Sequence, residues 1–133
     1  MPLGPIGQIA LTVSDSDRAE AFYETALGLR KLYRYGDLVF FDCAGVRLML
    51  SPPEDGAAVA PGQGAIYFRV PDLALVVAEL RGRNVPIVAE PALTAAMPDH
   101  DLWMAFLRDP DGHLLGLMME APKGYDPRAT TPG

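Results

Sequence analysis

The sequence predicts an α+β fold in which two tandem βαβββ modules form curved sheets around a cup, with the helices outside. The first observation is an internal repeat, because GQIALTVSD (7–15) matches GAIYFRVPD (64–72) at a spacing of 57 residues. The second is that CAGVRLMLS (43–51) matches PDGHLLGLM (110–118) at a spacing of 67 residues. The third is a helical spacing of apolar residues after each of the first two segments. The same supersecondary unit is therefore expected twice.

The first unit, module 1, covers about residues 6–51. It is predicted to contain strands at 7–13, 30–35, 38–43 and 46–50, and a helix at 15–27. Asp15 precedes the helical pattern and can act as its N-cap, because a carboxylate accepts hydrogen bonds from the first free amides of a helix. Gly28 stands where this helix should end, since glycine readily adopts the left-handed conformation that closes a helix.

The second unit, module 2, covers about residues 64–120. It is predicted to contain strands at 65–70, 86–89, 102–108 and 113–120, and a helix at 72–82 that begins at Asp72 and ends at Gly82. Module 2 has ten more residues than module 1, and these are expected at 85–101, where Pro86, Pro91 and Pro98 should interrupt any long regular element. Residues 52–63 are predicted to be a linker, and residues 121–133 a flexible tail.

Successive side chains of a strand point to opposite faces, so the alternation assigns one face of each sheet to the helices and the other to the cup. Ile9, Leu11 and Val13 are expected beneath the first helix. The residues between them in sequence, and their equivalents in the other first and last strands, are then expected to line the cup. These are Gln8, Ala10, Thr12, Arg47, Met49, Ser51, Ala65, Tyr67, Arg69, Leu114, Gly116, Met118 and Glu120.

Composition narrows the possible partners. A chain of 133 residues has the length of a single domain. Its formal net charge is −6 and its sequence has no basic patch, which argues against nucleic acid as a partner. No apolar run reaches the roughly 18 residues that cross a membrane, so no membrane partner is expected. The single Cys43 and the absence of a basic-then-apolar leader favour a reducing cytoplasm.

Two motifs carry a resemblance to a known group of proteins. The segment VSDSDRAEAFYETALGL (13–29) and the closing hairpin RDPDGHLLGLMME (108–120) resemble the vicinal oxygen chelate superfamily, which includes glyoxalase I, bleomycin-resistance proteins and extradiol dioxygenases. The resemblance covers about residues 6–120. It implies paired βαβββ modules, a small-molecule ligand in the cup and a homodimer.

The resemblance also implies where metal-using relatives carry their ligands, and those positions hold Gln8, Met49, Ala65 and Gly116 here. Gln8 offers one amide oxygen, and Met49 offers a thioether that suits hard or borderline divalent ions poorly. A divalent metal is therefore disfavoured, and no cofactor is expected.

His100 is the candidate catalytic residue. It lies in a loop of the extra segment, and histidine titrates near neutral pH, so it could act as a general base. The alternative is a surface histidine between Asp99 and Asp101. The other histidine, His113, follows a turn and is expected to fix the end of a hairpin.

The candidate ligand-binding residues combine apolar, aromatic and basic side chains. They are Gln8, Arg47, Met49, Ala65, Tyr67, Arg69, Trp103, Gly116 and Met118. Arg47 and Arg69 could bind an anionic group or simply reach solvent. Trp103 could stack on a flat ligand, although a buried aromatic residue more often belongs to the core.

Two functions follow from these residues. The first is a protein that binds a small, partly apolar molecule in its cup without the usual metal site, as in the bleomycin-resistance branch. The second is a lyase or isomerase of the glyoxalase or epimerase type, with a non-standard site around Gln8 and His100. A partner-binding module has no specific feature in its favour.

Overall fold

The computed structural model describes residues 2–128, and the chain divides into two compact units between Pro61 and Gly62. The first unit contains β1 (Gln8–Thr12), α1 (Ser16–Ala21), a π-helical turn (Phe22–Ala26), β2 (Arg30–Tyr35), β3 (Leu38–Cys43) and β4 (Val46–Ser51). The second contains β5 (Ala65–Arg69), α2 (Leu73–Gly82), β6 (Ile87–Ala96), β7 (Asp101–Arg108) and β8 (Leu114–Ala121). A short 3₁₀ turn (Glu54–Gly56) lies in the linker.

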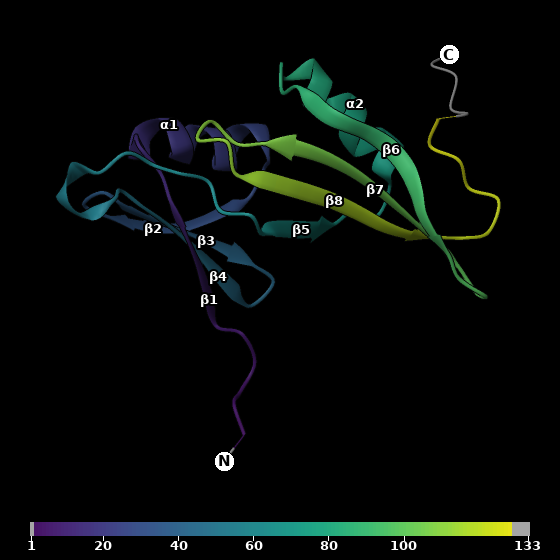
Figure 1. Ribbon diagram of the computed structural model, residues 1–133, viewed down its shortest axis with the longest axis horizontal. Coiled ribbons are helices and arrows are strands. Elements are labelled where there is room, and N and C mark those ends of the chain that lie inside the picture. Colours follow the sequence, from purple (N-terminus) through teal and green to yellow (C-terminus); the bar gives the residue numbers. More distant parts are fainter. Residues whose placement is uncertain (1, 129–133) are drawn as a thin grey trace. The chain divides into compact units, whose positions relative to one another are not determined.

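Each module forms its own four-stranded mixed sheet with a helix against it (Figure 1). The strand orders are β1-β4-β3-β2 and β5-β8-β7-β6, so the two modules have the same topology. In each, the first strand is parallel to the last and the remaining pairs are antiparallel. The predicted α+β class and the duplicated βαβββ unit are confirmed.

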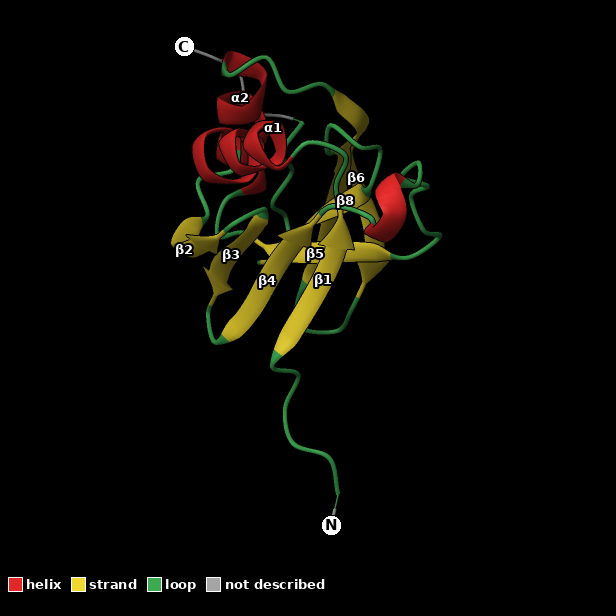
Figure 2. Cartoon of the chain, turned by 90° about the vertical axis from the view of Figure 1, so that its left-hand side faces the viewer, coloured by secondary structure: helices red, strands yellow, loops and turns green. Residues whose placement is uncertain are grey.

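The helices begin at the predicted caps. The carboxylate of Asp15 accepts hydrogen bonds from the amides of Asp17 and Arg18 at 3.0 and 3.1 Å, and that of Asp72 accepts one from Leu75 at 3.2 Å. The first helix ends in the π-helical turn, and Gly28 follows it in the left-handed region with φ 75°. In Figure 2 the helices, α1 and α2 among them, are red and the strands are yellow.

Burial alternates along the strands as the sequence predicts. In module 1, Val13, Leu48 and Leu50 are buried on the helix side, whereas Gln8 and Arg47 are exposed. In module 2 the helix side is occupied by buried residues of β7 and β8, including Trp103, Leu107, Leu115 and Leu117. Each sheet therefore has one face packed on its helix and one open face, by which we mean the face turned away from that helix.

The extra segment of module 2 differs from the prediction. The prolines were expected to interrupt regular structure, but β6 is a ten-residue strand that runs through Pro91. Two features permit this. Pro91 lies where the pairing register shifts between Ala89 and Ala92, and β6 is an edge strand, so the missing amide interrupts no continuous ladder.

The start of the predicted flexible tail also differs. Ala121 ends β8, and the following residues lie against α2 through specific contacts. The Tyr125 hydroxyl accepts a hydrogen bond from the Ala74 amide and donates one to the Asp72 carboxylate, both at 3.2 Å. Pro127 is buried, and the Arg128 guanidinium lies 5.0 Å from the centre of the Trp103 ring. Residues 129–133 of this predicted tail lie outside the described residues.

None of the helices among residues 2–128 combines the length and the apolar character needed to cross a membrane.

Candidate functional site

The open face of module 1 brings three candidate residues together. Gln8 on β1 is paired in register with Arg47 on β4, and Met49 lies two residues further along β4. The Gln8 carbonyl oxygen accepts a hydrogen bond from Arg47 Nε at 2.7 Å, and its amide nitrogen contacts Met49 Sδ at 3.8 Å. Both polar atoms of the Gln8 side-chain amide, which could have served as a metal ligand, therefore have partners within the sheet of module 1.

Aromatic rings continue this open face across β3 and β2. Phe40 is paired in register with Met49, and its ring stacks on Tyr33 with centroids 4.6 Å apart and an angle of 27°. The Arg47 guanidinium lies 5.5 Å from the centre of the Phe40 ring. Cation–π contact of this kind holds Arg47 along the sheet, where its charge also faces the Gln8 oxygen.

The open face of module 2 is centred on a close contact between Tyr67 and Gly116, which are paired in register across β5 and β8. A Cβ atom added to Gly116 would lie 2.5 and 2.8 Å from two atoms of the Tyr67 ring, and 3.2 Å from the Phe106 ring. Tyr67 and Phe106 meet edge to face, with centroids 5.8 Å apart. The missing side chain at position 116 is thus the space that the Tyr67 ring occupies.

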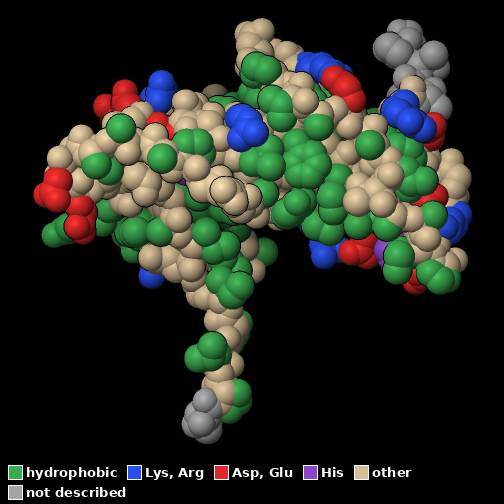
Figure 3. Space-filling view, in the orientation of Figure 1, with side chains coloured by type: hydrophobic (Ala, Val, Ile, Leu, Met, Phe, Trp, Pro, Cys, Tyr) green, Lys and Arg blue, Asp and Glu red, His purple; other side chains and the backbone are tan. Residues whose placement is uncertain are grey.

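A charged group lies further along the same face. Arg69 Nη1 forms an ion pair with Glu120 Oε1 at 2.9 Å, and the other carboxylate oxygen of Glu120 faces His100 Nε2 at 3.9 Å. His100 Nδ1 lies 2.8 Å from the Asp99 carboxylate, and this hydrogen bond is the main cause that lowers the pKa of Asp99. Basic, acidic and histidine side chains are seen close together at the lower edge of module 2 in Figure 3.

Trp103 lies apart from these residues. It is paired in register with Met119 on the helix-covered face of the sheet, and only 3% of its surface is exposed. The geometry therefore does not support Trp103 as a ligand-binding residue. It agrees with the alternative that Trp103 belongs to the core. The physical reason is parity, because Met104 and Phe106 are the residues of β7 that match the open-face positions of β8.

The remaining candidates have simpler surroundings. Ala65 is paired with Leu114 and offers no donor atom, and Met118 is paired with both Arg69 and Met104. The backbone amide of His113 donates to the Asp109 carboxylate at 2.8 Å, at the turn before β8. Burial raises the pKa of the Cys43 thiol, with a smaller contribution from the neighbouring Asp42 charge. A thiol with a raised pKa is a poor nucleophile.

The residues at the positions where the resemblance implies metal ligands do not fit a divalent ion. In module 1 the pair is Gln8 and Met49, and the single oxygen donor is already hydrogen-bonded to a guanidinium, whose charge opposes a second cation. In module 2 the pair is Ala65 and Gly116, which have no donor atoms in their side chains. Within residues 2–128, no group of three or more His, Cys, Asp or Glu side chains is arranged to hold a metal.

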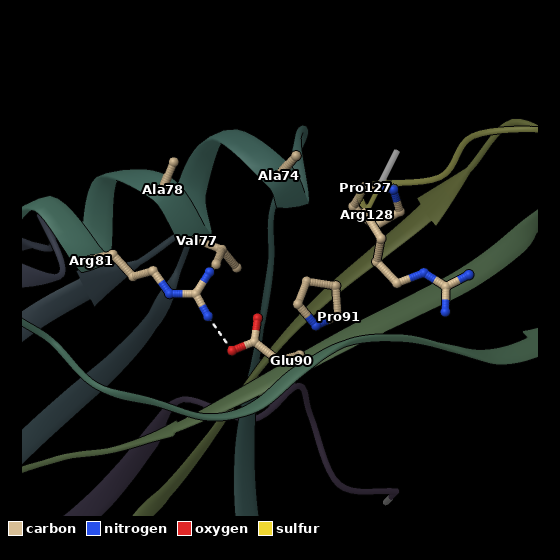
Figure 4. A pocket seen from close by; sticks show the side chains of 8 residues that line it. All are labelled: Ala74, Val77, Ala78, Arg81, Glu90, Pro91, Pro127 and Arg128. Carbon is tan, nitrogen blue, oxygen red and sulfur yellow. Dashed lines mark hydrogen bonds and ion pairs between the residues drawn. The ribbon is translucent and has the colours of Figure 1, made fainter. Parts of the chain in front are cut away.

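A groove of about 580 Å³ lies on the helix side of module 2 (Figure 4). Its walls are formed by α2, by β6 and by Pro127 and Arg128. It is lined by Ala74, Val77, Ala78, Arg81, Glu90, Pro91, Pro127 and Arg128. Its charged groups are already partnered, since Arg81 is paired with Glu90 across the groove and Arg128 is bound to Asp126. None of the candidate site residues lines it.

Sequence reasoning missed the aromatic residues of the middle and edge strands. Tyr33, Phe40 and Phe106 lie on the open faces. The alternation of side chains assigns faces in the sequence analysis only to the first and last strand of each module. The signal was available, because Phe40 and Phe106 occupy the same position in their modules, opposite Met49 and Gly116. The ion pair between Glu120 and Arg69 could not be predicted in this way, because it depends on the register between β8 and β5.

Comparison with known proteins places this geometry in a wider group. The model of the Glyoxalase/Bleomycin resistance protein/Dioxygenase superfamily matches residues 5–117. No curated protein matches the chain.

Solved structures share the fold over most of their length. A lactoylglutathione lyase from Agrobacterium tumefaciens is 24% identical, with a TM-score of 0.71 over 94% of this chain and 100% of that one. TnmS3, an antibiotic-binding protein from Streptomyces sp. CB03234, is 23% identical, with a TM-score of 0.72 over 91% and 99%. A protein from Alicyclobacillus acidocaldarius described by the superfamily's name is 21% identical, with a TM-score of 0.70 over 96% of each chain. At these identities the likeness concerns the fold alone.

Proposed function

The chain belongs to the Glyoxalase/Bleomycin resistance protein/Dioxygenase superfamily, and we propose that it binds a small, partly apolar molecule on the open faces of its sheets without the superfamily's usual metal site. One observation carries this proposal. The ring of Tyr67 lies directly against Gly116, at a position where the resemblance implies a ligand to the metal. An aromatic surface stands where metal-using relatives would carry a donor atom.

The lining supports a ligand of mixed character. Tyr67 is 46% exposed and Tyr33 is 48% exposed, so both rings offer surface for stacking. In module 1 Met49 lies opposite Phe40, and in module 2 Met118 lies opposite Arg69; methionine adapts readily to irregular apolar shapes. Pockets for small molecules are mostly apolar with a few polar groups, and Arg47 and Arg69 supply such groups here. TnmS3, which shares the fold, is described as binding an antibiotic.

A neutral aromatic probe tests the proposal. We expect 4-phenylbutan-1-ol to bind the full chain and to shift the amide resonances of β5 and β8 in two-dimensional NMR. Tyr67→Ser should weaken this binding about three- to tenfold, because it removes an exposed ring worth roughly 1 kcal/mol beyond its buried area.

The matched control is Tyr35→Ser, since Tyr35 is a 76% exposed tyrosine that makes none of the ring contacts described above. Equal weakening by both substitutions, or shifts confined to residues outside the open faces, would contradict the proposal.

A second candidate function is a lyase or isomerase of the glyoxalase or epimerase type, and one observation favours it. The Asp99 carboxylate accepts a hydrogen bond from His100 Nδ1, which leaves Nε2 as the basic nitrogen of the neutral ring. A base oriented in this way could remove a proton from a carbon beside a carbonyl. Gln8, the other residue of this hypothesis, lies in module 1 and is bound to Arg47.

Homodimerisation and a cytoplasmic location belong to the same proposal. Both rest on the resemblance and on the composition of the chain, and both stay predictions.

A further inference from the structure

We propose that module 2 recognises ligands that carry a primary amine on an apolar body, with the amine held between Glu120 and His100. This inference rests on the proposed function and adds the chemical class of the ligand. It depends on the residues at one end of the open face of module 2, where β8 ends and the turn between β6 and β7 lies.

The geometry leaves two hydrogen-bond acceptors facing each other. Glu120 Oε1 is taken by Arg69 at 2.9 Å, so Oε2 is the oxygen that faces His100. His100 Nδ1 must carry a hydrogen to bond the Asp99 carboxylate at 2.8 Å, and in a neutral imidazole the other nitrogen is then an acceptor. Nε2 and Oε2 lie 3.9 Å apart, which is too far for a direct hydrogen bond.

A group that satisfies both acceptors must donate at least two hydrogens. An ammonium or primary amine does so, whereas an alcohol has one hydrogen to donate and a carboxylate has none. A nitrogen at about 2.8 Å from each acceptor fits between them, because twice that length exceeds their separation. The spacing therefore favours an amine over an alcohol or a carboxylate.

The surrounding charges favour a cation when His100 is neutral. His100 faces Asp99 in its own turn and Glu120 on β8, and Glu120 is paired with Arg69 on β5. Asp101, which follows His100 in sequence, is paired with Lys123 at 2.7 Å. Three carboxylates against two cations give a net charge of −1.

The apolar part of the ligand has a place beside this group. Met118 precedes Glu120 by two residues on β8 and lies opposite both Arg69 and Met104, and Gly116 with its Tyr67 ring lies two residues further back. At about 3.3 Å per residue, Met118 lies roughly 7 Å along β8 from the polar group, and Gly116 with the Tyr67 ring lies roughly 13 Å from it. A phenyl ring on a four-carbon chain reaches past Met118 toward the Tyr67 ring.

The test compares three probes that share one body: 4-phenylbutan-1-amine, 4-phenylbutan-1-ol and 4-phenylbutanoate, titrated into the full chain at pH 7.5. We expect the amine to bind at least about fivefold more tightly than the alcohol, and the carboxylate more weakly than the alcohol. Glu120→Gln should remove the advantage of the amine over the alcohol. Glu54→Gln, which removes the same charge from the linker, should leave all three affinities unchanged.

Equal binding of the amine and the alcohol, or an advantage that survives Glu120→Gln, would overturn the inference and leave the proposed function standing. If neither the amine nor the alcohol binds, both the inference and the proposed function fail.

Discussion

Replacement of Trp103 by alanine is expected to lower the free energy of unfolding by about 3 to 5 kcal/mol, because it removes the largest side chain from the core of module 2. Trp103 is 3% exposed and lies on the helix-covered face opposite Met119. The Arg128 guanidinium covers its ring at 5.0 Å and would lose this contact as well. Urea denaturation followed by circular dichroism measures the change.

The conservative replacement Trp103→Phe separates packing from ligand contact. The indole Nε1 has no hydrogen-bond acceptor among the described residues, so phenylalanine sacrifices volume but no hydrogen bond. We expect a smaller loss of stability than with alanine, and unchanged affinity for 4-phenylbutan-1-ol. If Trp103→Phe weakens that probe as much as Tyr67→Ser does, Trp103 contacts the ligand, and its assignment to the core of module 2 is wrong.

Gly116→Ala is expected to destabilise the chain by about 1 to 3 kcal/mol through overpacking. The new methyl group would lie 2.5 Å from the Tyr67 ring and 3.2 Å from the Phe106 ring, well inside normal contact distances. The double variant Gly116→Ala with Tyr67→Ala should recover most of this loss, because the clash needs both side chains. A double-mutant cycle measured by thermal or urea unfolding gives the coupling energy.

The matched control is Gly64→Ala, a glycine just before β5 around which a Cβ atom would meet nothing within 4 Å. It should change stability little. Additive effects of the Gly116 and Tyr67 substitutions would mean that the ring does not rest on Gly116 in solution, and the observation that carries the proposed function would be lost.

The sequence alone could predict the parts of the fold that depend on local patterns. The bounds predicted for β2 and β3 agree with the structure residue by residue. Asp15 and Asp72 mark the starts of both helices, because a capping carboxylate acts on amides two or three residues away. Because the unit is duplicated, the elements predicted for module 1 are also expected in module 2.

Features that depend on tertiary context could not be predicted in this way. Pro91 disfavours a strand in general, and it is tolerated here only because β6 is an edge strand with a register shift at that point. The contacts of Tyr125 with the start of α2 join residues that are about fifty positions apart. A polar, proline-containing segment gives no local sign of such an anchor.

The candidate site shows the same division. Alternation placed Gln8, Arg47, Met49, Tyr67 and Gly116 on the open faces, but it could not show which of them contact one another. The hydrogen bond from Arg47 to Gln8 and the ring of Tyr67 over Gly116 depend on the strand register and on side-chain conformation. These two contacts are the ones that bear on metal binding, and the absence of a bound metal stays a prediction.

Calorimetric titration of the metal-free chain with Mn²⁺, Ni²⁺ and Zn²⁺ tests the central claim most directly. The claim is that the open faces offer too few donor atoms to hold a divalent ion, and it predicts no stoichiometric binding of any of the three. Binding of one ion per chain that is lost on Gln8→Ala or on His100→Ala would contradict it.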